Sequence, residues 1–265
     1  MPFCMLSPGL SIHYLEHNPS GSRCVLLLHG LGASAESWIF QLPILTGAGF
    51  RVIVPDARGF GCSPYPGKTG IVLMARDMAE LLQRLDITRT HVVGISMGGT
   101  IALQLAIDYP TLVERLVLVN AFIRLRLANP GTWLYYAFRY FILLTMGHQT
   151  QARVVAKRIF PHPGQAELRQ ALISQITQAD PAGYRATMRS LVRFNGLAQV
   201  AQIRSPTLVI TGSADTTVPP QLQVELCDRI PGARQAIIEG AGHAVIAECP
   251  DQFNRVLLDF LRHPD

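Results

Sequence analysis

The sequence has no run of about 18 apolar residues free of charge, so no membrane-spanning helix is expected. Its first residues, MPFCMLSPGL, lack both a basic start and a long apolar stretch, and this predicts that there is no secretory signal. Cysteine is scarce: the five cysteines are scattered and show no metal-ligand spacing. This usage is typical of reduced thiols in the cytoplasm and predicts no structural zinc. We also expect no catalytic metal, because the sequence shows no cluster of metal ligands, and no cofactor.

Acidic residues are rare in one part of the chain. Between residues 121 and 205, eleven lysines and arginines are opposed only by Glu167 and Asp180, so this segment carries a net charge of +9, against +5 for the whole chain. A solvated helical face, attraction of anionic substrates, or contact with an acidic surface would each explain such a patch. We expect a small-molecule substrate, no nucleic acid partner and no stable membrane insertion, and the oligomeric state is open.

Short apolar runs alternate with helical patterns through the first 120 residues. The runs CVLLLHG, FRVIVPD, HVVG and LVLVN are continuously apolar, which is typical of strands buried on both faces. Between them lie stretches that we interpret as amphipathic helices, MARDMAELLQRLDI and GTIALQLAIDYP. The order predicts an α/β fold with a parallel sheet and helices on both faces. The opening FCMLSPGLSIHYLEH predicts a hairpin.

The alternation stops near residue 121, and only helix signals follow until about residue 195. The runs PTLVITG and RQAIIEG and the helical CPDQFNRVLLDFLRH then resume the earlier pattern. We therefore predict a core formed by residues 1–121 and 205–265, and a helical cap formed by residues 122–204.

One serine, Ser96, lies in a glycine-rich turn between a predicted strand and a predicted helix. In HVVGISMGGTIALQLA, Ser96 lies between Gly94 and Gly98, at a sharp turn from a strand into a helix. Such a turn requires small neighbours, and it lifts the hydroxyl above the carboxyl edge of the sheet, where ligands of open α/β sheets bind. This pattern predicts that Ser96 is a nucleophile.

A nucleophilic serine needs a base and a carboxylate that orients it. Asp215 follows the strand PTLVITG, and His243 follows the next strand in the turn GAGH, so both would reach the edge that carries Ser96. Asp56, in DARGFG, is more consistent with bracing a loop.

A developing oxyanion needs backbone N–H donors. We expect one from Met97, directly after the serine, and one from Leu31 in the HGLG turn. In the same turn, His29 is expected to organise the loop and not to act as a second base.

Together, HGLG, DARGFGCS, GISMGG, GSADTTVP and GAGH resemble the α/β-hydrolase superfamily in its cap-bearing esterase and lactonase branch. The string VVGISMGGTIALQLA is especially similar to 3-oxoadipate enol-lactonases and small-molecule carboxylesterases. The resemblance implies a mostly parallel eight-stranded sheet, a helical cap after the sixth strand, and a Ser96–His243–Asp215 triad. Some relatives carry the acid after strand six, where this chain has Asn120, which leaves Asp215 as the acid.

The cap contains an aromatic stretch, GTWLYYAFRYFILL. Its Trp133, Tyr136 or Phe138 could line an apolar substrate pocket, or the rings could pack in the cap's own core. The function expected from the whole sequence is hydrolysis of a carboxylic ester or lactone of a small to medium apolar substrate. Hydrolysis of a carbon–carbon bond in a dienone and a non-catalytic ligand receptor are the alternatives.

Overall fold

The computed structural model describes residues 2–125 and 130–262, without the side chains of Pro130, Thr132 and Trp133. The strands are β1 (Phe3–Ser7), β2 (Leu10–His17), β3 (Arg23–Leu28), β4 (Phe50–Pro55), β5 (Thr90–Ile95), β6 (Val113–Val119), β7 (Thr207–Gly212) and β8 (Arg234–Ile238). The α-helices are α1 (Leu42–Gly47), α2 (Ile71–Arg84), α3 (Met97–Asp108), α4 (Pro130–Thr145), α5 (Gly147–Ile159), α6 (Ala166–Gln178), α7 (Pro181–Arg193), α8 (Pro220–Arg229), α9 (Val245–Glu248) and α10 (Pro250–Arg262).

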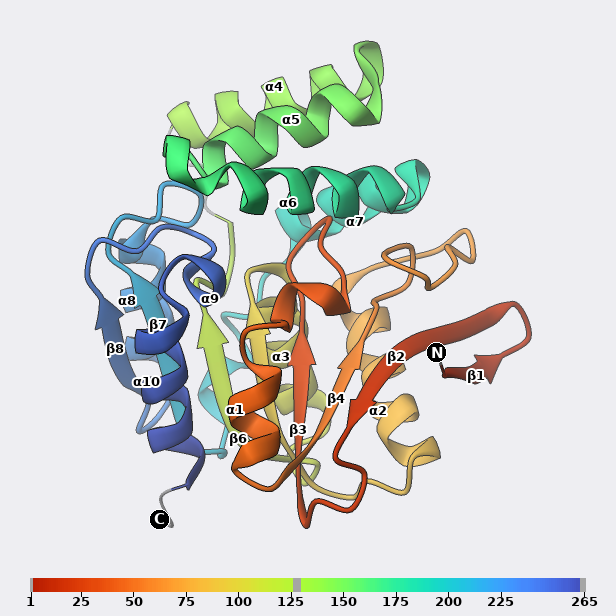
Figure 1. The fold of residues 1–265 in the computed structure, drawn as a ribbon, viewed down its shortest axis with the longest axis vertical. Helices are drawn as coiled ribbons and strands as arrows, with labels where there is room; N and C mark the ends of the chain where they lie inside the picture. The colour runs from red at the N-terminus through yellow and green to blue at the C-terminus, as the bar shows by residue number, and fades with distance from the viewer. Residues whose placement is uncertain (1, 126–129, 263–265) are drawn as a thin grey trace.

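A single eight-stranded sheet with the order β1-β2-β4-β3-β5-β6-β7-β8 forms the centre of the molecule (Figure 1). The strands from β4 to β8 in this order are parallel, whereas β1 and β2 are antiparallel, and β2 is also antiparallel to β4. The α/β class, the mostly parallel sheet and the N-terminal hairpin predicted from the sequence are confirmed. No helix in the described residues is long and apolar enough to cross a membrane.

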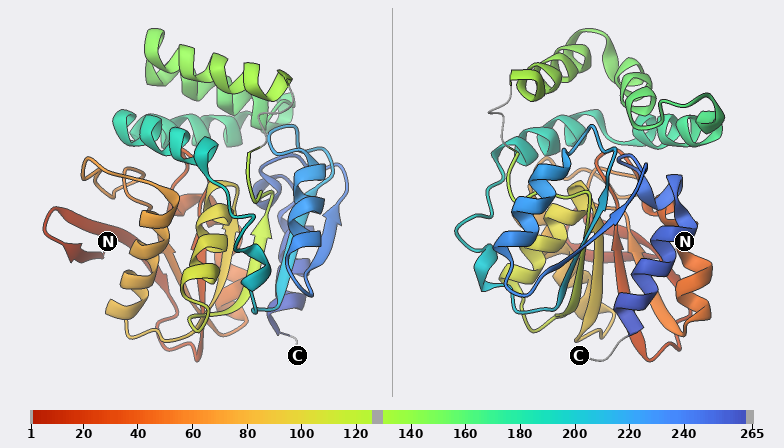
Figure 2. Two further views of the ribbon diagram at one scale, coloured as in Figure 1. Left: turned by 180° about the vertical axis from the view of Figure 1, so that it is seen from behind. Right: turned by 90° about the vertical axis from the view of Figure 1, so that its left-hand side faces the viewer.

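Helices cover both faces of the sheet (Figure 2). One hydrophobic cluster joins the sheet to α1, α9 and α10, with Trp38, Leu45 and Phe253 fully buried. A second cluster joins it to α2, α3 and α8. The two clusters account for the continuously apolar strands, because each strand packs side chains on both faces.

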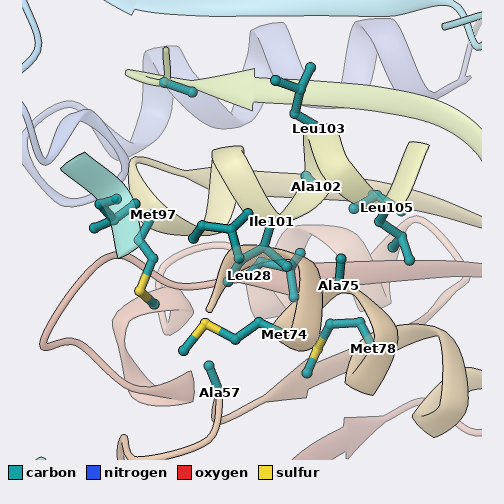
Figure 3. Close-up of a cluster of buried hydrophobic side chains, with 14 of the residues drawn as sticks. Leu28, Ala57, Met74, Ala75, Met78, Met97, Ile101, Ala102, Leu103 and Leu105 are labelled. Atoms are coloured by element: carbon teal, nitrogen blue, oxygen red, sulfur yellow. The ribbon is translucent and has the colours of Figure 1, made fainter. Parts of the chain in front are cut away.

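The prediction that GTIALQLAIDYP is amphipathic is wrong. Every residue of α3 from Met97 to Ala106 is buried, because the helix packs on β3, β5 and β6 and also contacts α2 and the 3₁₀ turn Val200–Gln202. Figure 3 shows Met74 and Met78 of α2 in the same buried cluster as Ile101 of α3. By contrast, α2 buries one face and exposes the other, as its sequence predicts.

Helices α4–α7, which we call the cap, follow β6 and precede β7, and they lie as a layer above the carboxyl edge of the sheet (Figure 1). In the cap, α4 packs on α5, and α5 packs on α6. The cap is therefore one continuous helical insertion between β6 and β7.

A buried histidine in β5 makes the stability of the core sensitive to pH. His91 is 1% exposed, and burial lowers its pKa to about 4. An unfolded histidine titrates near 6.5, so the unfolded chain binds this proton first. The free energy of unfolding is thus expected to fall by about 3 kcal/mol as the pH drops from about 6.5 to about 4.

Urea unfolding between pH 4 and pH 8 tests this expectation. His91→Gln should flatten the decline, whereas His162→Gln, at an exposed position of the cap, should leave it unchanged. Burial also lowers the pKa of His29 and His148, so part of the decline should persist in the His91 variant. Equal declines in the His91 variant and the wild type would contradict the assignment to His91.

Candidate active site

Ser96 occupies the turn between β5 and α3 in a strained backbone conformation. Its φ of 54° and ψ of −114° lie in a region that residues other than glycine rarely adopt. The bond from Ser96 N–H to the Val119 carbonyl, 2.9 Å, and the bond from Thr100 N–H to the Ser96 carbonyl, 3.1 Å, hold this conformation. The sharp turn predicted from the sequence is therefore present.

The two glycines around Ser96 are required by close backbone contacts. A Cβ atom at Gly94 would collide with the Gly98 carbonyl, and one at Gly98 would collide with the Leu28 carbonyl of β3. We expect Gly98→Ala to lower the free energy of unfolding by about 2 kcal/mol or more, because the obstacle is backbone. Gly164→Ala is the control, since nothing lies within 4 Å of its Cβ position. Chemical denaturation of both variants tests this, and equal stabilities would contradict the steric argument.

Asp215 and His243 lie in the loops after β7 and β8 and are hydrogen-bonded to each other. The Asp215 Oδ2 and His243 Nδ1 atoms are 2.8 Å apart, and both residues are buried. The other carboxylate oxygen, Oδ1, accepts bonds from the N–H groups of Thr217, 2.7 Å, and Val218, 2.9 Å. The carboxylate is thus held by backbone on one side and faces the imidazole on the other.

Ser96 and His243 line the same cavity, which has a volume of about 310 Å³. Leu31 also lines it, and Met97 begins α3 directly behind Ser96. The first N–H groups of a helix have no acceptor within the helix, so the Met97 N–H is available at this position. The structure therefore gathers the predicted nucleophile, base and oxyanion donors at one edge of the sheet.

His29 and Asp56 organise the loops beneath the cavity. His29 Nδ1 bonds the Gly30 carbonyl at 2.8 Å, and its Nε2 accepts from the Ala57 N–H at 3.0 Å. Burial lowers the pKa of His29, which is consistent with a neutral ring that donates at one nitrogen and accepts at the other. Asp56 Oδ1 accepts from the Ala35 N–H at 2.7 Å. These contacts match the bracing roles expected for both residues.

Among the residues that the structure describes, one group of side chains could offer atoms to a metal ion. Donor atoms of His13, Asp56 and Cys62 lie within 4.8 Å of one another. Asp56 Oδ2, however, already bonds His13 Nδ1 at 2.7 Å and accepts from the Cys62 N–H at 2.9 Å. A metal ion would have to displace these bonds, which hold the loop after β4.

Asn120 and Glu248 support the histidine loop, a role that their place in the sequence did not predict for either residue. The Asn120 amide donates to the carbonyls of Gly242, 3.0 Å, and His243, 2.7 Å, and its oxygen accepts from the Gly212 N–H at 2.9 Å. The Glu248 carboxylate accepts from the N–H groups of Gly242, 3.0 Å, and Ala244, 2.8 Å. The acidic residue five positions after His243 was the available signal in the sequence.

One face of α4 in the cap lines part of the cavity. Tyr135, Tyr136 and Arg139 line it, and burial raises the pKa of Tyr136 to about 12, so this phenol stays protonated. The structure corrects the prediction for Phe138, which is 51% exposed, because residues two apart on a helix do not share a face. The prediction for Trp133 concerns a side chain outside the described part of the structure.

Comparison with known proteins identifies the family. Residues 23–250 match the alpha/beta hydrolase fold family. A relative from Variovorax paradoxus (strain S110), named "Putative carbamate hydrolase RutD", is 35% identical over 261 residues, which cover 95% of this chain and 96% of the relative.

Two solved structures are similar over nearly the whole chain. The enol-lactonase from Burkholderia xenovorans LB400 has a TM-score of 0.89 and 27% identity and covers 99% of this chain and 100% of its own. A thermophilic esterase from Thermogutta terrifontis has a TM-score of 0.84 and 26% identity, with 96% and 93% covered. With the fold and the family match together, this chain belongs to the α/β-hydrolase fold family.

Proposed function

We propose that this chain is a serine hydrolase that cleaves a carboxylic ester or lactone through an acyl-enzyme on Ser96. The observation that carries the proposal is the 2.8 Å pair of Asp215 and His243, whose imidazole lines the same cavity as the strained Ser96. The cavity of about 310 Å³ is at the small end of ligand pockets, which supports a small substrate.

The reaction would proceed in two halves. The Ser96 oxygen attacks the carbonyl carbon while His243 Nε2 takes the hydroxyl proton, and the resulting oxyanion accepts bonds from the N–H groups of Leu31 and Met97. Collapse of this intermediate breaks the bond to the alcohol oxygen, which takes the proton from His243. A water molecule then attacks the acyl carbon with His243 again as the base, and the acid leaves with Ser96 restored. Asp215 holds the ring with Nδ1 protonated throughout.

Hydrolysis of a carbamate is the second candidate, and the names of the relatives favour it. A carbamate presents the same carbonyl carbon to Ser96, and the intermediate would be a carbamoyl-enzyme in place of an acyl-enzyme. Because a carbamate carbonyl receives electrons from its nitrogen, the two halves of the reaction should be slower than for an ester of equal size.

A panel of ethyl esters, lactones and carbamates of graded chain length tests the proposal, with product formation followed at constant pH. We expect kcat/KM to be highest for an ester or lactone. A higher value for the carbamates would assign the second candidate. Turnover restricted to a dienone with an activated carbon–carbon bond would assign the remaining enzymatic alternative, and binding without turnover of any compound would indicate a receptor.

A further inference from the structure

Arg139 is a buried cation in the wall of the cavity. It lies in α4 and is only 4% exposed. One guanidinium nitrogen donates to the Tyr184 hydroxyl at 2.6 Å. In the amide orientation that satisfies both groups, the Gln151 oxygen accepts from Arg139 Nε at 2.9 Å. The guanidinium carbon also lies 5.5 Å and 5.7 Å from the ring centroids of Tyr135 and Tyr136. All of these neighbours are neutral.

The charge of Arg139 has no carboxylate partner among the residues that the structure describes. The two acidic residues that line the cavity, Glu36 and Glu167, are exposed and make no ion pair with it. Arg58 gives the contrast within the same chain, since it is 7% exposed and is held by both carboxylate oxygens of Asp77. Burial of an unpaired charge is costly, and a cation over aromatic rings recovers only part of that cost.

The anion that completes this site can come from the cavity. Arg139 and Ser96 line the same space, with Arg139 on the cap side and Ser96 on the sheet side. Apolar residues of the cap, among them Val155, Ile159 and Leu172, line the space as well. A bound molecule would thus meet a nucleophile at the sheet, an apolar wall, and a guanidinium in the cap, whose planar donors suit a carboxylate.

We infer that Arg139 binds a carboxylate of the substrate, so that the substrate is a small ester or lactone with an apolar middle and an anionic group remote from the scissile carbonyl. The inference rests on the proposed function for the identity of the scissile group. The apolar substrate expected from the sequence is thereby refined: its body is apolar, and one end carries a negative charge.

The monoethyl esters of straight-chain dicarboxylic acids with four to seven carbons provide the test, each compared with the neutral ω-amide of the same length. The amide nearly preserves the shape and removes the charge. We expect the wild type to favour the best anionic ester over its amide by about 10- to 100-fold in kcat/KM. Arg139→Met should bring this ratio to about one, and Arg139→Lys should keep part of it.

Arg153→Met is the matched control. It removes the same charge from an exposed position in the cap, so the ratio should stay at the wild-type value if Arg139 acts by contact. An equal fall of the ratio in both variants would indicate long-range attraction by the cap and overturn the assignment to Arg139. If Arg139→Met does not fold, the wild type alone provides the test. A ratio of one or below between kcat/KM for the anionic ester and kcat/KM for its amide then overturns the inference.

Calorimetric binding to Ser96→Ala separates this inference from the proposed function, because it needs no turnover. We call the proposed carboxylate site at Arg139 the subsite. It is supported, even if no ester is hydrolysed, when Ser96→Ala binds the anionic ester tightly and the amide weakly and the double variant Ser96→Ala/Arg139→Met loses this difference. Equal hydrolysis of both compounds by the wild type supports the reaction and overturns the subsite. Failure of every compound in the series to bind overturns the subsite as well.

Discussion

Ser96→Ala is expected to lower kcat for ester hydrolysis by roughly 10⁴- to 10⁶-fold. The hydroxyl is the only part of the side chain that the substitution removes, and the strained turn that carries it is formed by backbone bonds to Val119 and Thr100. Alanine fits this position with little change in packing. The loss should therefore appear in the chemical step and not in the free energy of unfolding.

An organophosphonate gives an independent readout of the same expectation. The wild type should gain the mass of one adduct, located on the peptide that contains Ser96, and Ser96→Ala should gain none. Ser37→Ala is the control, because Ser37 lines the same cavity but donates its hydroxyl to the Ser34 carbonyl at 2.8 Å. Labelling that persists in Ser96→Ala would reject the nucleophile.

Asp215→Asn is expected to lower kcat on the order of 10⁴-fold and to leave the fold intact. An asparagine oxygen can still accept the two N–H bonds from Thr217 and Val218 that now reach Oδ1. The amide nitrogen would then face His243 Nδ1, a donor opposite a donor. The ring would have to place its proton on Nε2, where it could no longer take the proton of Ser96.

Asp56→Asn tests the competing assignment of the acid. The amide nitrogen cannot accept the bond from the Cys62 N–H that Oδ2 now accepts at 2.9 Å, so we expect a loss of about 1–3 kcal/mol in the free energy of unfolding. The effect on kcat should be far smaller than that of Asp215→Asn. Steady-state kinetics and thermal unfolding of both variants test these expectations. A larger loss of kcat in Asp56→Asn than in Asp215→Asn would make Asp56 the acid.

The strands and the nucleophile turn could be predicted because each depends on neighbours in the chain. Continuous apolar runs are enough to identify strands buried on both faces. Gly94 and Gly98 mark the turn at Ser96, since both contacts that exclude a side chain there involve backbone. Asp215 and His243 could be proposed because parallel strands end at one edge of the sheet, which brings the loops that follow them together.

Contacts between distant segments could not be predicted in this way. The sequence of α3 shows where it is apolar, but not that α2 and the 3₁₀ turn Val200–Gln202 pack beside it on the sheet and leave Met97 to Ala106 without an exposed face. Asn120 bonds the last residue of β7 and the loop that follows β8, and its sequence neighbourhood contains no sign of either contact. In α4, the choice between Tyr136 and Phe138 depends on how the helix is rotated over the sheet, which the packing on α5 sets.

The sequence by itself determined the order of strands and helices, the position of the helical insertion, and the serine, aspartate and histidine that line up at one edge. Local periodicity and chain order carry that information. Only the tertiary structure decided which side of the cap faces the cavity and that Arg139 lies there without an acidic partner among the described residues. In the sequence, Arg139 is one of eleven basic residues in a charged segment. Its burial results from the docking of α4 against α5 and Tyr184, and such packing between distant residues leaves no local pattern.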